Sequence, residues 1–276
     1  MIVLLIVIAV IVVLAVLGLL AIRPCTGRRE RLAPFAAQPI AHRGLHGDGV
    51  PENSLAAFAR AAEEGYGIEL DVRRTADNRL VVMHDKTLER MCGDPRAVCE
   101  VRYDELAELR LHGTDERIPL LSEVLAVVDG AAVPLVVEVK TDRWFSRTPA
   151  LVDEMMRAYA DPSGGAYCIE SFNPMALRWF KRHSPQTIRG QISDNFLKVK
   201  AGGPWIGRFA MTNMVLNFLA RPDFIAYNLA YRRQVAYRTC RRLYKAAGAA
   251  WVVRSPAQLE TVRDAFDIFI FEGFRP

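Results

Sequence analysis

The sequence predicts an α/β protein built as a (β/α)8 TIM-type barrel, with a small insertion and an N-terminal transmembrane helix. From residue 39 onward, short apolar runs alternate with helical patterns, as expected where crossover helices join parallel strands. Polar residues follow several of these runs, at the strand ends where barrel enzymes place their active sites. An apolar segment at residues 1–22 precedes the alternating part.

Residues 1–22 carry no charged side chain. As a helix they reach roughly 33 Å, enough to cross a hydrocarbon core about 30 Å thick. A secretory signal peptide is the alternative, but it places basic residues before its apolar core and small residues at a cleavage site. Here the basic residues follow, at Arg23, Arg28, Arg29 and Arg31. We therefore expect a single-pass membrane anchor, with the following domain on the cytoplasmic side by the positive-inside rule.

Residues 23–38 are predicted to form a basic tether, and residues 39–276 a single domain. Nine apolar runs within this domain are candidate strands, one more than a barrel needs: 40–42, 68–72, 80–84, 135–139, 167–171, 187–192, 224–228, 249–253 and 268–272. Helical patterns lie between them at 54–64, 148–159, 174–182, 233–247 and 256–266. Residues 86–119 are predicted to be an insertion after the third strand.

Composition argues against a disulfide framework, a zinc site and nucleic-acid binding. The five cysteines are odd in number and lack C-x-x-C spacing, which favours reduced thiols over a disulfide framework or a zinc site. The net charge of +5 is modest, and no basic stripe interleaved with aromatic residues indicates nucleic-acid binding. The arginines at 232, 233, 238, 241 and 242 fit either a solvated helix face or contact with anionic lipid headgroups. No feature indicates an oligomeric state.

The first two strands deliver the first candidate site residues. The strand at 40–42 ends in His42, and Arg43 follows it. Glu69 and Asp71 lie two residues apart on the next strand, so their side chains point to the same side. Two like charges on an apolar strand are costly unless a cation neutralises them, and oxygen ligands suit Mg²⁺ or Ca²⁺.

Two further strands repeat this pattern. His84 follows the strand that begins at residue 80, and Glu138 and Lys140 lie at the end of the strand at 135–139. Together the four strands supply two histidines for proton transfer, three carboxylates for one metal ion, and two cations to meet an anion. This set suits phosphate-ester chemistry.

Several motifs resemble the signature of the glycerophosphodiester phosphodiesterase family, in order and spacing. They are His42-Arg43-Gly44, Pro51-Glu52-Asn53-Ser54, Glu69-Leu70-Asp71-Val72, Val82-Met83-His84-Asp85, Ile118-Pro119-Leu120, Glu138-Val139-Lys140 and Ser171-Phe172. The clear part of the resemblance covers residues 40–172. Trp251-Val252-Val253-Arg254 is similar to a late strand of the family, whereas Phe271-Glu272 departs from its usual Thr-Asp ending.

The resemblance implies a barrel of the phospholipase C-like phosphodiesterase type and metal-dependent hydrolysis of a glycerophosphodiester to glycerol 3-phosphate and an alcohol. It implies that Glu69, Asp71 and Glu138 bind one divalent metal ion and that His42 and His84 are the acid–base pair. Arg43 and Lys140 would hold the substrate phosphate. Candidate substrate contacts are Glu52, Phe172 and Trp251, although a structural turn fits Glu52 equally well.

Two alternatives keep the same site. A lysophospholipid cleaved in the manner of phospholipase D is a larger, lipid-derived substrate that the anchor favours. A non-catalytic membrane sensor that only binds glycerophosphoryl groups is disfavoured because the full acid–base and metal set is present.

Residues 195–219 are unusually apolar from Trp205 onward, which fits either contact with the bilayer or ordinary barrel packing.

Overall fold

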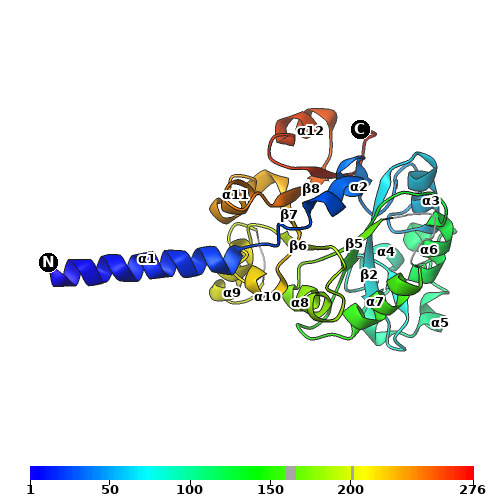
Figure 1. The fold of residues 1–276 in the computed structure, drawn as a ribbon. Coiled ribbons are helices and arrows are strands. Elements are labelled where there is room, and N and C mark those ends of the chain that lie inside the picture. The colour runs from blue at the N-terminus through cyan, green and yellow to red at the C-terminus, as the bar shows by residue number, and fades with distance from the viewer. Residues whose placement is uncertain (160–165, 200–201) are drawn as a thin grey trace.

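The computed structural model describes residues 1–159, 166–199 and 202–276, and the described chain forms one closed barrel (Figure 1). Its eight parallel strands are β1 (Ile40–Ala41), β2 (Gly67–Arg74), β4 (Leu135–Val139), β5 (Tyr167–Ser171), β6 (Arg189–Ser193), β7 (Phe224–Asn228), β8 (Ala247–Val253) and β9 (Ile268–Phe271). The sheet closes because β1 pairs with both β2 and β9. The predicted TIM-type fold is confirmed.

The third of the nine predicted strands, β3 (Leu80–Val82), is the extra one and lies outside the parallel barrel. It pairs antiparallel with β2, Val72 opposite Val82 and Arg74 opposite Leu80. The prediction that His84 follows a strand of the parallel set is therefore wrong. The chain leaves β2, turns, and returns toward the barrel, where the Met83 amide donates to the carbonyl of Asp71, so His84 arrives beside Asp71 from the opposite direction.

The inward side chains of the barrel change character along the strands. A two-residue step leads from a buried apolar residue to a polar one: from Ile40 to His42, from Val136 to Glu138, and from Cys168 to Glu170. Because side chains alternate along a strand, both members of each pair point into the barrel. The barrel is thus filled by apolar side chains at one end and lined by titratable ones at the other.

Within the described chain, eight helices surround the barrel wall (Figure 1): α3 (Leu55–Glu63), α6 (Leu121–Val128), α7 (Thr148–Ala158), α8 (Pro174–His183), α9 (Trp205–Thr212), α10 (Asn217–Ala220), α11 (Val235–Arg242) and α12 (Pro256–Val262). The first begins where the Ser54 hydroxyl accepts a hydrogen bond from the Ala57 amide, an N-cap. The helix predicted at 233–247 ends earlier, because Ala247 already belongs to β8.

Residues between β3 and α6 form four short helical segments, α4 (Glu89–Cys92), η2 (Val98–Glu100), α5 (Tyr103–Leu106) and η3 (Leu111–Gly113). They enclose a separate apolar cluster that includes Leu88, Leu106 and Ile118, all fully buried. This small core occupies the region predicted to be an insertion.

The N-terminal segment begins with α1 (Ile2–Ile22), which projects from the barrel (Figure 1). Within the described residues it is the one helix long and apolar enough to cross a membrane. The predicted tether at 23–38 is folded rather than extended, into η1 (Arg29–Leu32) and α2 (Ala33–Ala36). Leu32 and Phe35 are buried against the apolar end of the barrel interior, so this segment closes that end.

Candidate active site and metal centre

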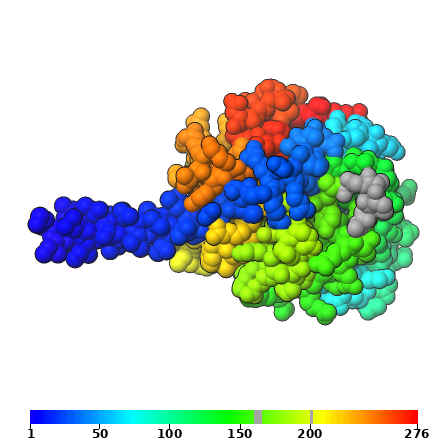
Figure 2. All heavy atoms as spheres, viewed as in Figure 1, coloured from blue at the N-terminus to red at the C-terminus, as the bar shows by residue number. Residues whose placement is uncertain are grey.

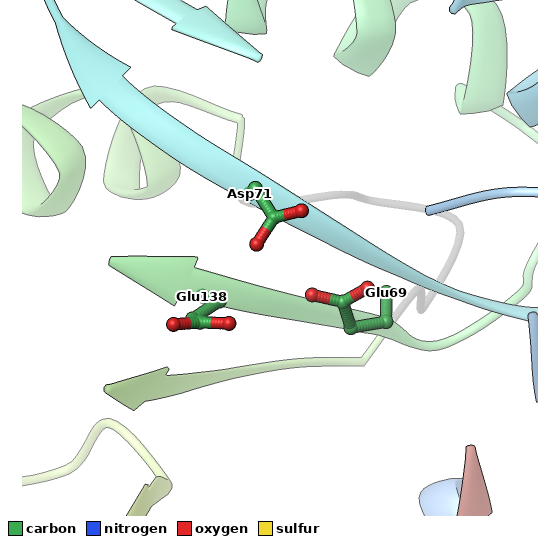
Figure 3. A group of neighbouring side chains, drawn as sticks. All are labelled: Glu69, Asp71 and Glu138. Carbon is green, nitrogen blue, oxygen red and sulfur yellow. The ribbon is translucent and has the colours of Figure 1, made fainter. Parts of the chain in front are cut away.

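Three carboxylates from two neighbouring strands point toward one another (Figure 3). Glu69 and Asp71 lie on β2, and Asp71 is paired in register with Glu138 on β4. One oxygen of each lies within 4.8 Å of the others, and all three side chains are buried. The two-residue spacing and the parallel register together bring them to one point.

Two cations border this cluster. Lys140 Nζ lies 3.0 Å from Asp71 Oδ1 and 2.7 Å from Glu138 Oε2. Arg43 approaches from β1: its backbone amide donates to Glu69 Oε2 at 2.9 Å, and its Nε lies 3.4 Å from Asp71 Oδ2. Arg43 has a φ of +56°, uncommon outside glycine, and in this turn its amide and its side chain both contact the cluster.

The loop after β1 holds these groups in place. Glu52 accepts a hydrogen bond from Arg43 at 2.7 Å, and the Asn53 side-chain Nδ2 donates to Asp71 Oδ2 at 2.8 Å. Glu52 also accepts from Arg90, at 2.6 Å. Glu52 and Asn53 therefore orient charged groups of the site, immediately before the N-cap of α3.

Burial and mutual repulsion set the protonation of the carboxylates. Burial and the neighbouring Asp71 and Glu138 raise the pKa of Glu69 well above its usual value. Burial also raises the pKa of Glu138, to about 7, although Lys140 opposes the rise. Burial acts on Asp71 in the same direction, but Lys140, His84 and Arg43 outweigh it and hold the pKa of Asp71 below its usual range.

A fourth carboxylate, Glu170 on β5, was missed by the sequence analysis. It lines the same pocket, its Oε2 is buried with no hydrogen-bond partner among the described residues, and burial raises its pKa well above the usual value. Four carboxylates then face two cations, Arg43 and Lys140, which leaves two negative charges when all are ionised. A divalent cation would balance them, and oxygen-only ligands suit Mg²⁺ or Ca²⁺, so the residues present fit the predicted metal.

His42 is held by an acidic residue from the last strand. Its Nδ1 lies 2.5 Å from Glu272 Oε2, and its Nε2 lies 3.9 Å from Glu69 Oε2. Glu272 Oε1 in turn accepts from Arg254 at 2.6 Å. The hydrogen bond from His42 lowers the pKa of Glu272 to about 2, so an ionised carboxylate fixes the ring and leaves Nε2 on the side of the acidic cluster.

His84 is held in the same way. Its Nδ1 lies 2.7 Å from Asp85 Oδ1, and Arg90 donates to the other oxygen of Asp85 at 2.5 Å. Burial lowers the pKa of His84, against the attraction of Asp71, which favours the neutral imidazole. Each histidine thus has its Nδ1 occupied by a carboxylate that an arginine supports.

The pocket above these groups combines charged and aromatic walls. His42, His84, Glu69 and Lys140 line it together with Phe172 and Trp251. The two aromatic rings meet edge to face with centroids 5.7 Å apart, and Lys140 Nζ lies 6.0 Å from the centre of Phe172. Two of the predicted site residues, Asp71 and Glu52, do not line this pocket: Asp71 contacts Lys140 and Arg43, and Glu52 lies behind Arg43.

The missed residues share one signal. Glu170 follows Cys168, and Glu272 follows Ile268 and Ile270, in the same two-residue phase that places Glu138 after Val136. Extending that phase along every strand would have identified both. Asp85, Arg90 and Arg254 lack this signal because their roles depend on side-chain contacts across the pocket rim.

Comparison with known proteins gives one consistent result. The model of the glycerophosphoryl diester phosphodiesterase family matches residues 42–264. A glycerophosphodiester phosphodiesterase of Caldanaerobacter subterraneus subsp. tengcongensis is 34% identical over 161 residues, 55% of this chain and 65% of that protein. A protein of Rattus norvegicus named lysophospholipase D GDPD1 is 31% identical over 145 residues, 48% of this chain and 46% of its own length. The matched part of the chain thus spans less than two thirds of these curated relatives.

Solved structures share the fold. A phosphodiesterase of Oleispira antarctica, in complex with sn-glycerol-3-phosphate, superposes with a TM-score of 0.70 at 23% identity, over 87% of this chain and 94% of that one. A glycerophosphodiester phosphodiesterase of Thermotoga maritima gives a TM-score of 0.61 at 25% identity, over 84% and 92% of the two chains.

Proposed function

The chain belongs to the glycerophosphoryl diester phosphodiesterase family, and on that premise we propose that it hydrolyses glycerophosphodiesters to glycerol 3-phosphate and an alcohol. The observation that carries this proposal is the meeting of two carboxylate-supported histidines and the acidic cluster in one pocket. Phosphodiester cleavage requires one group to accept a proton, another to donate one, and positive charge at the phosphoryl oxygens.

Each residue has a role in this proposal. Glu69, Asp71 and Glu138 would hold one Mg²⁺ or Ca²⁺ ion, and a bound divalent ion supplies positive charge that stabilises the phosphoryl oxygens. Lys140 and Arg43 bind the phosphate from either side of the cluster. His42 and His84 exchange protons with the attacking and leaving oxygens through Nε2, because each Nδ1 is occupied. Glu272 and Asp85 keep the rings in that orientation.

Hydrolysis of glycerophosphocholine, measured with Mg²⁺, with Ca²⁺ and with a chelator, tests this proposal. His42→Ala and Glu69→Ala should each abolish most activity. His183→Ala is the matched control, because His183 is exposed on α8 and contacts Trp179 rather than the pocket. Activity that is indifferent to the chelator and to both site variants would refute the mechanism.

A second candidate activity, lysophospholipase D-type hydrolysis of lysophospholipids, is favoured by a groove beside the pocket. Trp144, Phe172 and Met211 line this groove, and Phe172 also lines the active-site pocket. Trp144 is 53% exposed, which suits a surface for an acyl chain. Trp144→Ala should lower kcat/KM for lysophosphatidylcholine and leave that for glycerophosphocholine unchanged; equal effects on the two substrates would refute the groove's role.

We also propose that α1 is a single-pass anchor and that the barrel lies in the cytoplasm. The length and composition of α1 support the span, and the arginines that follow it support the orientation. A cleaved signal would leave a mature chain that lacks α1, so N-terminal sequencing of the purified protein distinguishes the two. Protection of the barrel from protease in right-side-out vesicles tests the orientation.

A further inference from the structure

The end of α1 is fixed directly to the barrel. The carbonyl of Ile22 accepts a hydrogen bond from the Asn217 side chain of α10 at 3.1 Å, and the carbonyl of Leu19 accepts one from the Tyr244 hydroxyl at 2.9 Å. Three residues after Ile22, the Cys25 amide donates to the carbonyl of Pro222 at 2.8 Å. These hydrogen bonds fix the end of the helix to the barrel, and in the space-filling view the helix runs directly into the body of the molecule (Figure 2).

The length of α1 leaves no spacer between the barrel and the membrane. The helix has 21 residues, and a span needs about 20 apolar residues. If α1 crosses the bilayer, nearly all of it is used, and the barrel surface at Ile22 lies at the level of the lipid headgroups. That surface is formed by α9, α10 and α11, which lie beside the point where α1 leaves the barrel (Figure 1).

This face displays apolar side chains instead of burying them. On α9, Trp205 is 61% exposed and Ile206 72%, and Thr212 is the one buried residue of the helix. Phe209 stacks on Trp205 with centroids 5.3 Å apart. Phe218 on α10 is also exposed. Ordinary barrel packing, the other interpretation of this apolar segment, is therefore wrong for these residues; residues 200–201 of the segment lie outside the described chain.

Basic residues interleave with apolar ones on α11. Arg238 and Arg242 lie on the same face as Val235, which is 74% exposed, and Leu243, which is 57% exposed. Neither arginine forms an ion pair within the described chain, whereas the neighbouring Arg241 pairs with Asp267. A helix face with exposed aliphatic residues between unpaired arginines is typical of helices that lie on anionic membrane surfaces.

We infer that the face formed by α9, α10 and α11 docks on the leaflet from which α1 emerges, with Trp205, Phe209 and Val235 inserted among the lipids and Arg238 and Arg242 on anionic headgroups. This inference rests on the proposed membrane span. The occupant is the bilayer itself, because the fixed end of α1 brings this face, and not the opposite side formed by α3, α5 and α6, to the membrane.

The test uses the full chain in nanodiscs whose lipids carry brominated acyl chains, which quench tryptophans that enter the bilayer. Wild-type fluorescence should be quenched, and Trp205→Phe should lose that quenched component. In the Trp205→Phe background, Val235→Trp should restore quenching. Val127→Trp is the matched control, because Val127 is exposed on α6, on the far side of the barrel, and it should remain unquenched.

A second arm tests the charges. Adding phosphatidylglycerol to phosphatidylcholine nanodiscs should increase the quenching of Trp205, and the Arg238→Glu/Arg242→Glu double variant should lose this increase. Arg102→Glu/Arg117→Glu, two exposed arginines of the insertion region, should keep it. If the chain co-elutes with nanodiscs but Trp205 stays unquenched, the docking face is refuted while the span stands. If the chain fails to enter nanodiscs, both the span and the docking face are refuted.

Discussion

Removing Glu272 tests whether the last strand supports catalysis through His42. Glu272→Ala deletes the carboxylate that lies 2.5 Å from His42 Nδ1. A hydrogen bond to a charged group contributes about 1.5–3 kcal/mol, and each 1.36 kcal/mol corresponds to a factor of ten in rate. We therefore expect kcat for glycerophosphocholine to fall roughly 10- to 150-fold. KM should change little, because Glu272 lies behind His42.

The assay compares kcat and KM with the stability of the same variants. Glu272→Gln should lose less activity than Glu272→Ala, since its amide oxygen can still accept the hydrogen bond from His42. Glu260→Ala is the control: Glu260 is 67% exposed and pairs with Arg263 on α12, so its removal should leave kcat unchanged. An unchanged kcat in Glu272→Ala, or a fall explained entirely by unfolding, would refute a positioning role for Glu272.

Three further predictions concern stability. Lys140→Met should lower the free energy of unfolding in urea by about 3–5 kcal/mol, because the buried Glu138 loses its cation and the buried Asp71 keeps only Arg43; no loss would contradict the pairing. The pKa of Glu272 is lowered from 4.5 to about 2, so its stabilisation is complete above pH 4.5 and lost as the pH falls toward 2. The difference in urea midpoint between wild type and Glu272→Gln should shrink across that window, and a constant difference would contradict it. Gly190→Ala should lower the Tm, since its Cβ would lie 2.2 Å from the buried Phe224 ring, whereas Gly27→Ala has open space around it and should not.

The barrel was predictable because its strands are short apolar runs separated by helical patterns. All nine runs became strands, but an apolar run reads the same in either direction. The sequence around Leu80–Val82 therefore could not reveal that β3 runs antiparallel to β2. The direction depends on the tight return at Thr75–Arg79, where the Thr75 amide donates to the carbonyl of Arg79 and Asn78 has a φ of +64°.

Site residues were predictable only where they lie on a strand, two residues apart from other residues that point into the barrel. The spacing of Glu69 and Asp71 placed both on one side of β2, and the parallel register brought Glu138 to them. The supports of the two histidines come from side chains distant in sequence, as with Glu272, 230 positions from His42. The folding of residues 23–38 against the barrel was also hidden, because the burial of Leu32 and Phe35 depends on the open end of the barrel that they close.

The four buried carboxylates at one end of the barrel link metal binding to the stability of the folded protein. Burial and mutual repulsion raise the pKa values of Glu69 and Glu170, so ionising the four carboxylates together without a bound metal costs free energy. Lys140 relieves part of this repulsion by pairing with Asp71 and Glu138, but within the described chain it forms no ion pair with Glu69 or Glu170. A divalent cation among Glu69, Asp71 and Glu138 would favour their ionised forms and so stabilise the folded state by mass action. Mg²⁺ or Ca²⁺ should therefore raise the Tm of the inactive His42→Ala variant, a readout of binding that is independent of catalysis. An unchanged Tm across a wide range of metal concentration would show that the carboxylates are balanced by protons, Lys140 and Arg43 alone.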